Sequence, residues 1–222
     1  MLFIADLKRW VQLQNPKFSF MQKSFGNNLF KLLDVGSGNH SASKTVSLFQ
    51  QCEYYGLDLS KDYNNDEEDF KVMKGFYEFD LTKLDFSSIP DGFFDGIWIV
   101  HVIEHLHNGD LVLKGLLPKL KAGGYLYVEY PGKRSTKLPS MKGSLNFSDD
   151  HSHVRLYNKR ELKVLFSNNG CEVLQMGYRR SLFYTFATPA RILFRWIRGK
   201  PVTGNIFWDL VGFAEFLYGR KR

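Results

Sequence analysis

The chain has 222 residues, of which 44% are hydrophobic and 24% charged, and only two are cysteines, Cys52 and Cys171. This length suits one domain with a substantial core. Two distant thiols exclude a disulfide framework and a cysteine-ligated zinc site. They favour a reducing compartment such as the cytoplasm.

Neither a secretion signal nor a membrane span is predicted. The first ten residues, MLFIADLKRW, include Asp6 and lack both a basic start and a cleavage site. No uncharged apolar run reaches the roughly 18 residues of a membrane-spanning helix. The net charge of +7 arises in residues 179–222, where nine Lys and Arg stand against two acidic residues. We therefore expect a cytoplasmic protein with a neutral core and a basic tail.

Short apolar runs alternate with segments of helical periodicity along the chain. In chain order we predict strand 31–35, helix 40–51, strand 53–60, a strand within 70–81, strand 92–100, helix 108–124, strand 125–131, helix 159–170 and strand 171–178. Near-continuous apolar strands separated by helices predict an α/β fold whose parallel sheet is covered on both faces. We expect one domain, with a helical or irregular lead-in (1–29), a core (30–178) and an extension (179–222).

Three local features refine this outline. Asn108 is a suitable N-cap for a helix that ends at Gly123-Gly124, and Asn158 is a suitable N-cap for the helix that follows it. The acidic run 62–69 is predicted to be a solvated turn. Residues 131–150 show no clear structure, and a loop of this length after a strand predicts a lid over a binding site.

A glycine turn follows the first strand in the sequence DVGSGNH. Gly36 and Gly38 permit a tight turn and a close approach of the backbone to a ligand. Asp58 ends the second strand 22 residues after Gly36, and a carboxylate at about this distance can bind ribose hydroxyls. A third glycine of the dinucleotide fingerprint is replaced by Ser41, and no P-loop is present. These features predict a nucleoside-containing ligand at the carboxyl end of the sheet.

Six segments carry a family resemblance: LLDVGSGNH, YYGLDLS, FYEFDLT, FFDGIWIVHVIEHL, LLPKLKAGGYLYVEYPG and DDHSHVRLYNKRELKVLFSNNGCEVL. In this order they resemble the class I S-adenosylmethionine-dependent methyltransferases, in particular the small-molecule type 11 and type 12 groups, over about residues 30–178. The resemblance implies a Rossmann-like, doubly wound sheet of seven strands. They run mainly parallel, with the last strand antiparallel and helices on both faces.

The same resemblance implies S-adenosylmethionine as cofactor and assigns residues to it. Asp34, Gly36, Ser37 and Gly38 would bind the methionine end, Asp58 and Leu59 the ribose, Asp80 and Leu81 the adenine, and His101 and Val102 would lie beneath the cofactor. Asn39-His40 stand where many members have a further glycine, so the methionine end departs from the family pattern.

The segment HVIEH, from His101 to His105, matches the inverted zinc-peptidase signature. That signature needs His101 and His105 on one helical face with Glu104 between them. The preceding residues IWIV predict a strand, so His101 ends a strand and no regular helix aligns the two imidazoles. We therefore expect no metal at HVIEH.

The segment SDDHSHVR carries Asp149, Asp150, His151 and His153. A divalent-ion site, a substrate or base function, and a scaffold for the neighbouring loop are three interpretations. If the acceptor is a hydroxyl, a histidine near neutral pH is a suitable base. The candidate catalytic residues are His105, His151 and His153, with Glu104 as orienting residue, and His105 is favoured.

The basic tail contains FATPARILFRWIRGK, which predicts a helix beginning at Pro189 with an apolar and a basic side. The segment 212–222 predicts a last strand returning antiparallel to the sheet edge. A basic face beside Trp and Phe suits a membrane surface or a lipid-linked acceptor. Nucleic-acid phosphates are an alternative, and a helix packed on the sheet or at a homodimer contact is another.

The sequence thus predicts an S-adenosylmethionine-dependent methyltransferase acting on a small-molecule or glycan-like acceptor, which can include a lipid-linked one, by O-methylation. Two alternatives stay open. One is an RNA methyltransferase that uses the basic tail, and the other is a protein that binds the cofactor without turnover.

Overall fold

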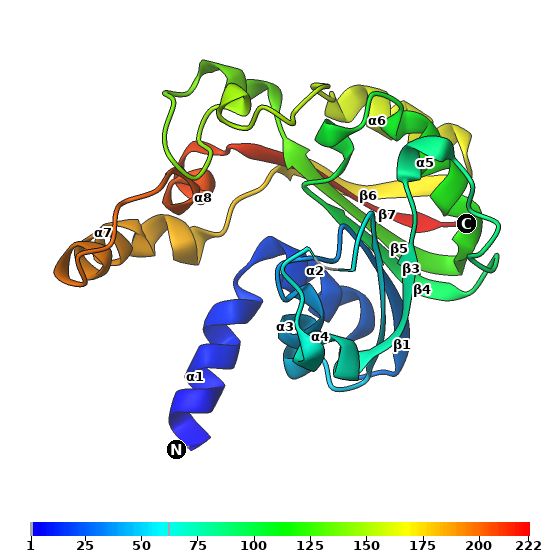
Figure 1. Ribbon diagram of the computed structural model, residues 1–222, viewed down its shortest axis with the longest axis horizontal. Helices are drawn as coiled ribbons and strands as arrows, with labels where there is room; N and C mark the ends of the chain where they lie inside the picture. Colours follow the sequence, from blue (N-terminus) through cyan, green and yellow to red (C-terminus); the bar gives the residue numbers. More distant parts are fainter. Residues whose placement is uncertain (1, 62) are drawn as a thin grey trace.

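A computed structural model describes residues 2–61 and 63–222, and for residues 2–5 only the backbone. Its centre is a seven-stranded sheet in the order β3-β2-β1-β4-β5-β7-β6 (Figure 1). The strands are β1 (Phe30–Val35), β2 (Cys52–Asp58), β3 (Met73–Glu78), β4 (Phe94–Val100), β5 (Leu120–Pro131), β6 (Cys171–Tyr178) and β7 (Ala214–Lys221). Only β7 pairs antiparallel with its neighbours. The predicted Rossmann-like fold is confirmed.

Helices cover both faces of the sheet because successive strand residues point to opposite sides. Leu32 and Trp98 face a core with α2 and α3, whereas Leu33 and Ile97 face a core with α5 and α6. The helices are α1 (Leu2–Leu13), α2 (Pro16–Phe25), α3 (Ser41–Leu48), α4 (Glu67–Val72), α5 (Gly109–Leu116), α6 (Lys159–Asn168), α7 (Leu182–Ile197) and α8 (Trp208–Val211). The lead-in expected at 1–29 thus contains α1 and α2.

The sequence suggested that the last strand lies at the sheet edge. The structure differs. Strand β7 is inserted between β5 and β6, and β6 forms the edge. Leu217 and Tyr218 in β7 are buried, since each face of an interior strand packs against one of the two cores. The insertion makes the C-terminal strand an interior strand, next to the edge strand β6.

The helix predicted at 108–124 is too long. Helix α5 ends at Leu116, and β5 begins at Leu120 and includes both glycines of the expected helix end. Pro118 accounts for the early end, because it has no N–H to continue the α-helical hydrogen bonds, and residues Leu117–Lys119 form a 3-10 turn instead. Asn108 makes no cap hydrogen bond, and its side-chain amide donates to the Thr82 carbonyl instead.

Asp66, Glu67 and Glu68 of the acidic run are exposed, as expected, but the run begins a helix and its Asp69 is not solvated; Asp62 lies outside the described residues. Asp66 caps α4, and Asp69 is fully buried. The Asp69 carboxylate accepts from Ser43 Oγ at 2.5 Å and contacts His40 Nδ1 at 2.7 Å. Although burial by itself raises the pKa of Asp69, these hydrogen bonds lower it to about 2. Asp69 therefore joins α4 to α3.

Two predicted boundaries in the second half also differ. Helix α7 begins at Leu182 with Ser181 as its N-cap, and Pro189 lies inside the helix. The loop 131–150 contains two short 3-10 turns, Lys133–Lys137 and Phe147–Asp149.

No helix in residues 2–61 and 63–222 combines the length and apolarity of a bilayer crossing.

Replacing Asp69 by Asn is expected to lower the free energy of unfolding at pH 7 by about 2 kcal/mol, because each unit of pKa shift corresponds to about 1.4 kcal/mol. The pKa is lowered from 3.8 to about 2, so this stabilisation is present above pH 3.8 and disappears as the pH falls toward 2. Urea denaturation across this range measures it. The exposed Glu67→Gln change should have little effect, and identical pH profiles of wild type and Asp69→Asn would contradict the assignment.

Candidate cofactor and acceptor site

A pocket of about 670 Å³ lies at the carboxyl ends of β1, β2 and β4, the edge at which open α/β sheets bind ligands. Eight residues selected from the sequence line it: Gly36, Asp58, Leu59, Asp80, Leu81, His101, Val102 and His105. The wall is completed by Asn39, Ser60, Tyr63, Phe79, Thr82, Val100, Leu106 and Ser152. Residues from both halves of the sheet therefore meet around one space.

The turn after β1 requires glycine for two reasons. Gly36 has a φ of +74°, and a Cβ atom there would lie 2.3 Å from Val102 Cγ2. At Gly38 a Cβ atom would lie 2.4 Å from the Tyr63 ring. Ser37 and Gly38 do not line the pocket, but the Gly38 N–H donates to Asp58. The glycine turn therefore shapes the pocket and holds the carboxylate on its far wall.

Asp58 and Asp80 present their carboxylates from the ends of β2 and β3. The backbone N–H groups of Leu59 and Gly38 donate to Asp58 at 2.8 and 3.2 Å. Burial raises the pKa of Asp58, and the two backbone donors reduce this rise. The hydroxyl and N–H of Thr82 donate to Asp80 and lower its pKa. Since a carboxylate oxygen can accept more than one hydrogen bond, both groups can still bind ligand donors.

Asp34 lies deeper than the resemblance implies and is absent from the pocket wall. Its Oδ2 accepts hydrogen bonds from Lys17 Nζ at 2.9 Å, Ser41 Oγ at 2.5 Å and Tyr54 O–H at 2.8 Å. These donors come from α2, α3 and β2. In this arrangement Asp34 fixes the elements around the glycine turn, and a contact with the cofactor remains a prediction.

His101 has a φ of +56°, and its ring lies between two buried glutamates. Its Nδ1 is 3.1 Å from Glu104 Oε1, and its Nε2 is 3.3 Å from Glu129 Oε1. Burial by itself lowers the pKa of His101, but the two carboxylates raise it to about 9. The ring also contacts Trp208 of α8 at 4.9 Å between centroids. His101 is therefore a cation in the floor of the pocket.

The ionic contacts continue away from the pocket. Arg179 Nε lies 3.3 Å from Glu129, and Arg179 Nη1 donates to Asp209 at 2.6 Å. All three side chains are buried. Burial raises the pKa of Glu129, but Arg179 and His101 lower it to about 2. Sequence reasoning missed these residues, although a lone Glu inside the buried strand YLYVEYP was a usable signal.

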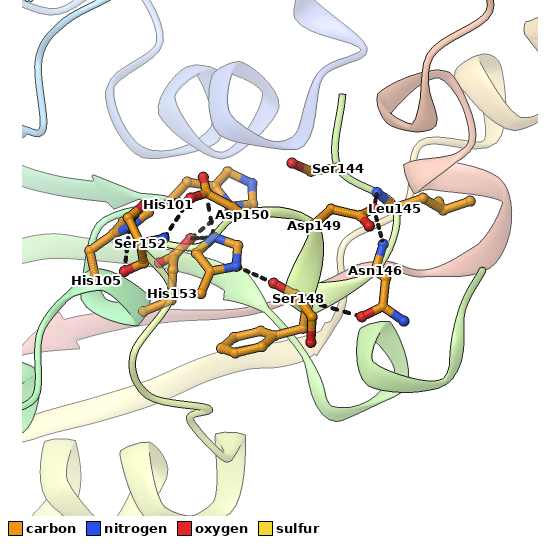
Figure 2. Close-up of polar contacts among 12 residues, drawn as sticks. His101, His105, Ser144, Leu145, Asn146, Ser148, Asp149, Asp150, Ser152 and His153 are labelled. Carbon is orange, nitrogen blue, oxygen red and sulfur yellow. Dashed lines mark hydrogen bonds and ion pairs between the residues drawn. The ribbon is translucent and has the colours of Figure 1, made fainter. Parts of the chain in front are cut away.

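The acceptor side of the pocket is formed by His105 and Ser152. His105 Nδ1 lies 2.9 Å from Ser152 Oγ and 3.2 Å from the Ser152 carbonyl, and Ser152 Oγ donates to Asp150 (Figure 2). His105 is thus oriented by Ser152, whereas Glu104 contacts His101. His153 lies behind this wall with Nδ1 2.7 Å from the Phe147 carbonyl.

The remaining sequence candidates have other positions. His151 is exposed and does not line the pocket. Asp149 accepts the N–H groups of Met141, Leu145 and Asn146. Burial by itself raises the pKa of Asp149. The hydrogen bonds that it accepts, the strongest effect being that of the Ser140 hydroxyl, nevertheless keep this pKa well below its usual range. Hydrogen bonds to Asp149 thus hold part of the 131–150 loop, but none of its residues, the lysines included, lines the pocket over which the sequence predicted a lid.

Comparison with known proteins adds the family. A family model described as a methyltransferase domain matches residues 6–176, whereas no curated protein matches significantly. A SAM-dependent methyltransferase from Archaeoglobus fulgidus is similar in structure (19% identity, 98% of this chain and 94% of that chain, TM-score 0.61). A SAM-dependent methyltransferase from Mesorhizobium loti is also similar (10% identity, 92% and 97%, TM-score 0.64).

A third similar structure is the 1,6-didemethyltoxoflavin-N1-methyltransferase from Burkholderia thailandensis, with bound 1,6-didemethyltoxoflavin and S-adenosylhomocysteine (13% identity, 94% and 77%, TM-score 0.60). These identities establish a shared fold, and the domain match establishes the family. The resemblance noted in the sequence is thereby confirmed: the chain belongs to the class I S-adenosylmethionine-dependent methyltransferases, with S-adenosylmethionine as its cofactor.

Proposed function

We propose that this methyltransferase methylates a hydroxyl group of a small-molecule or glycan-like acceptor, including one carried on a lipid. The observation that carries the proposal is the single pocket in which Gly36 and Asp58 face His105 and Ser152. Its volume of about 670 Å³ falls in the range of about 300–1,000 Å³ that is usual for small-molecule sites. Cofactor and acceptor can therefore share it.

The residues present fit the cofactor. A Cβ atom at position 36 would collide with Val102, so the backbone is kept open where the methionine end is expected. Asp58 and Asp80 offer carboxylate oxygens to ribose hydroxyls and to the adenine amine. When bound, the cofactor supplies a sulfonium methyl group, whose C–S bond breaks as a C–O bond to the acceptor forms. Close positioning of the two reactants and exclusion of water then provide most of the rate enhancement.

His105 and Ser152 support a hydroxyl acceptor. Both line the pocket, and the ring of His105 is held through its Nδ1. Its Nε2 is left to accept a hydrogen bond from an acceptor hydroxyl, whose proton must leave during the transfer. We assign to this wall the binding of the hydroxyl and the release of its proton, with His105 as its central residue and Glu104 and His153 behind it.

Helices α1 and α7 support contact with a lipid surface. They project from the same side of the molecule (Figure 1), and Trp10 contacts Phe183 edge to face at 5.1 Å between ring centroids. Phe186 and Trp196 are 81% and 75% exposed. The large apolar side chains exposed on the two helices are Leu7, Trp10, Leu182, Phe186, Leu193, Phe194, Trp196 and Ile197. We call these residues the α1/α7 surface.

The charge beside the α1/α7 surface is positive. Both acidic residues of the tail, Asp209 and Glu215, are buried, while α7 carries Arg191 and Arg195 and is followed by Arg198. Exposed aromatic and aliphatic side chains next to arginines suit the interface of a membrane with anionic lipids. Because α8 follows α7 and its Trp208 contacts His101, the C-terminal extension that carries this surface also reaches the floor of the pocket.

Cofactor binding tests the site. Asp58→Asn removes one charge from the proposed ribose contact and is expected to weaken S-adenosylmethionine binding by about 10- to 100-fold, as the loss of a charged hydrogen bond costs about 1.5–3 kcal/mol. Isothermal titration calorimetry measures this change. The exposed Asp85→Asn variant is the matched control, and equal dissociation constants for the two variants would refute the ribose assignment.

Turnover tests the reaction. Wild-type protein incubated with S-adenosylmethionine and a panel of sugars, small alcohols, lipid-linked glycans and RNA should form S-adenosylhomocysteine only with a hydroxyl-bearing small or glycan acceptor. Mass spectrometry locates the added methyl group. Methylation of nitrogen or of RNA, or absence of turnover with every acceptor, would overturn the proposal.

Vesicle binding tests the α1/α7 surface. The wild type should co-sediment with vesicles containing phosphatidylglycerol and bind pure phosphatidylcholine at least several-fold less. Phe186→Ser with Trp196→Ser should abolish this binding, whereas Val164→Ser, which changes an apolar residue that is 59% exposed on α6, should retain it. A homodimer in light scattering, or salt-sensitive RNA binding, that is lost in the same double variant would reassign the surface.

A further inference from the structure

Glu104 is an unusual group beside the pocket. Its side chain is 1% exposed, and its Oε2 has no hydrogen-bond partner in the described residues. Its other oxygen, Oε1, contacts His101. An unpartnered buried carboxylate oxygen costs about 1–3 kcal/mol or more, so this atom has capacity to bind a further group.

His153 offers a lone pair toward the same carboxylate. Its Nδ1 lies 2.7 Å from the Phe147 carbonyl oxygen, which only accepts, so Nδ1 carries the proton. In the neutral ring Nε2 is then unprotonated, and it lies 4.0 Å from Glu104 Oε1 and 3.9 Å from Asp150 Oδ2. Three electron-pair donors therefore face one another, an arrangement that suits a bound cation.

His105 is held in the same tautomer. Ser152 Oγ donates its proton to Asp150, so Ser152 Oγ and the Ser152 carbonyl both act as acceptors toward His105 Nδ1. The proton of the neutral ring therefore lies on Nδ1, and Nε2 carries the lone pair. The His105 and His153 rings are 4.9 Å apart between centroids, on two segments that the fold brings together (Figure 2).

We propose that Glu104, His105 and His153 form a binding site for a divalent transition-metal ion of the Zn²⁺ or Fe²⁺ type. One ligand atom from each residue lies within 4.8 Å of the other two. Two imidazoles and one carboxylate are a donor set that suits these ions. Tetrahedral coordination with metal–ligand distances of about 2.0–2.2 Å requires ligand atoms about 3.5 Å apart, so binding would draw the three side chains together by roughly 1 Å.

The environment of the three ligands suits a metal. The Phe147 carbonyl and Ser152 fix the ring orientations through the opposite nitrogens, as outer hydrogen bonds do for metal-bound imidazoles. Because His105 lines the pocket, an open coordination position would face the acceptor. This inference rests on the proposed function: the bound ion would polarise the acceptor hydroxyl and favour loss of its proton to solvent, the role otherwise assigned to the imidazole.

Metal content tests the site directly. The full-length wild type, incubated with Zn²⁺ and freed of unbound ion by gel filtration, should retain about one Zn²⁺ per chain by mass spectrometry of the metal. With Co²⁺ it should give visible absorption bands typical of low coordination number. His153→Gln and His105→Gln should lower the retained metal at least tenfold, whereas His151→Gln, which changes the exposed histidine of the same segment, should retain it.

The outcomes separate this inference from the proposed function. EDTA-treated wild type should bind S-adenosylmethionine with unchanged affinity; loss of cofactor binding in every metal state would count against the proposed function. Metal retention below about one tenth per chain, or equal retention in His153→Gln and His151→Gln, would overturn the metal site alone. Circular dichroism spectra of the variants establish that they are folded.

Discussion

A line of alternating charges is buried between the sheet and the C-terminal helices, and it connects the pocket floor to the C-terminal extension. Glu104, His101, Glu129, Arg179 and Asp209 follow one another with contacts of 2.6–3.3 Å. A buried charge costs several kcal/mol unless it is compensated, and in this line each charge lies between opposite ones or next to one. The line runs from the segment after β4 through β5 to α8. The pocket floor and the docked C-terminal helices therefore depend on the same set of buried charges.

This coupling gives the C-terminal extension a role at the site. Its residues do not line the pocket, yet Trp208 contacts His101 and Asp209 anchors Arg179. The two buried glutamates beside His101 favour its charged form. Arg179, which precedes α7, compensates the charge of Glu129. In our proposal the same extension meets the lipid surface, so a membrane contact and the pocket floor would share one rigid segment.

The sequence predicted the fold well where local pattern decides structure. Apolar runs located the strands, because a buried parallel strand must be apolar on both faces. The glycine turn and Asp58 located the edge of the sheet at which the pocket lies from short-range spacing. The predictions were wrong where contacts between residues far apart in the chain decide the structure. Asp69 can be buried because His40 and Ser43 form hydrogen bonds with its carboxylate. Asn108 donates to the Thr82 carbonyl instead of capping its helix.

The sequence by itself determined the α/β class, the glycine turn after the first strand and the basic character of the tail, because each depends on residues close together in the chain. Tertiary structure alone decided that β7 enters the sheet between β5 and β6, that Glu129 and Arg179 compensate His101, and that His153 reaches Glu104. The physical reason is that burial and charge compensation are properties of neighbours in space. Residues 49 apart in the chain, such as Glu104 and His153, become neighbours only when the sheet assembles.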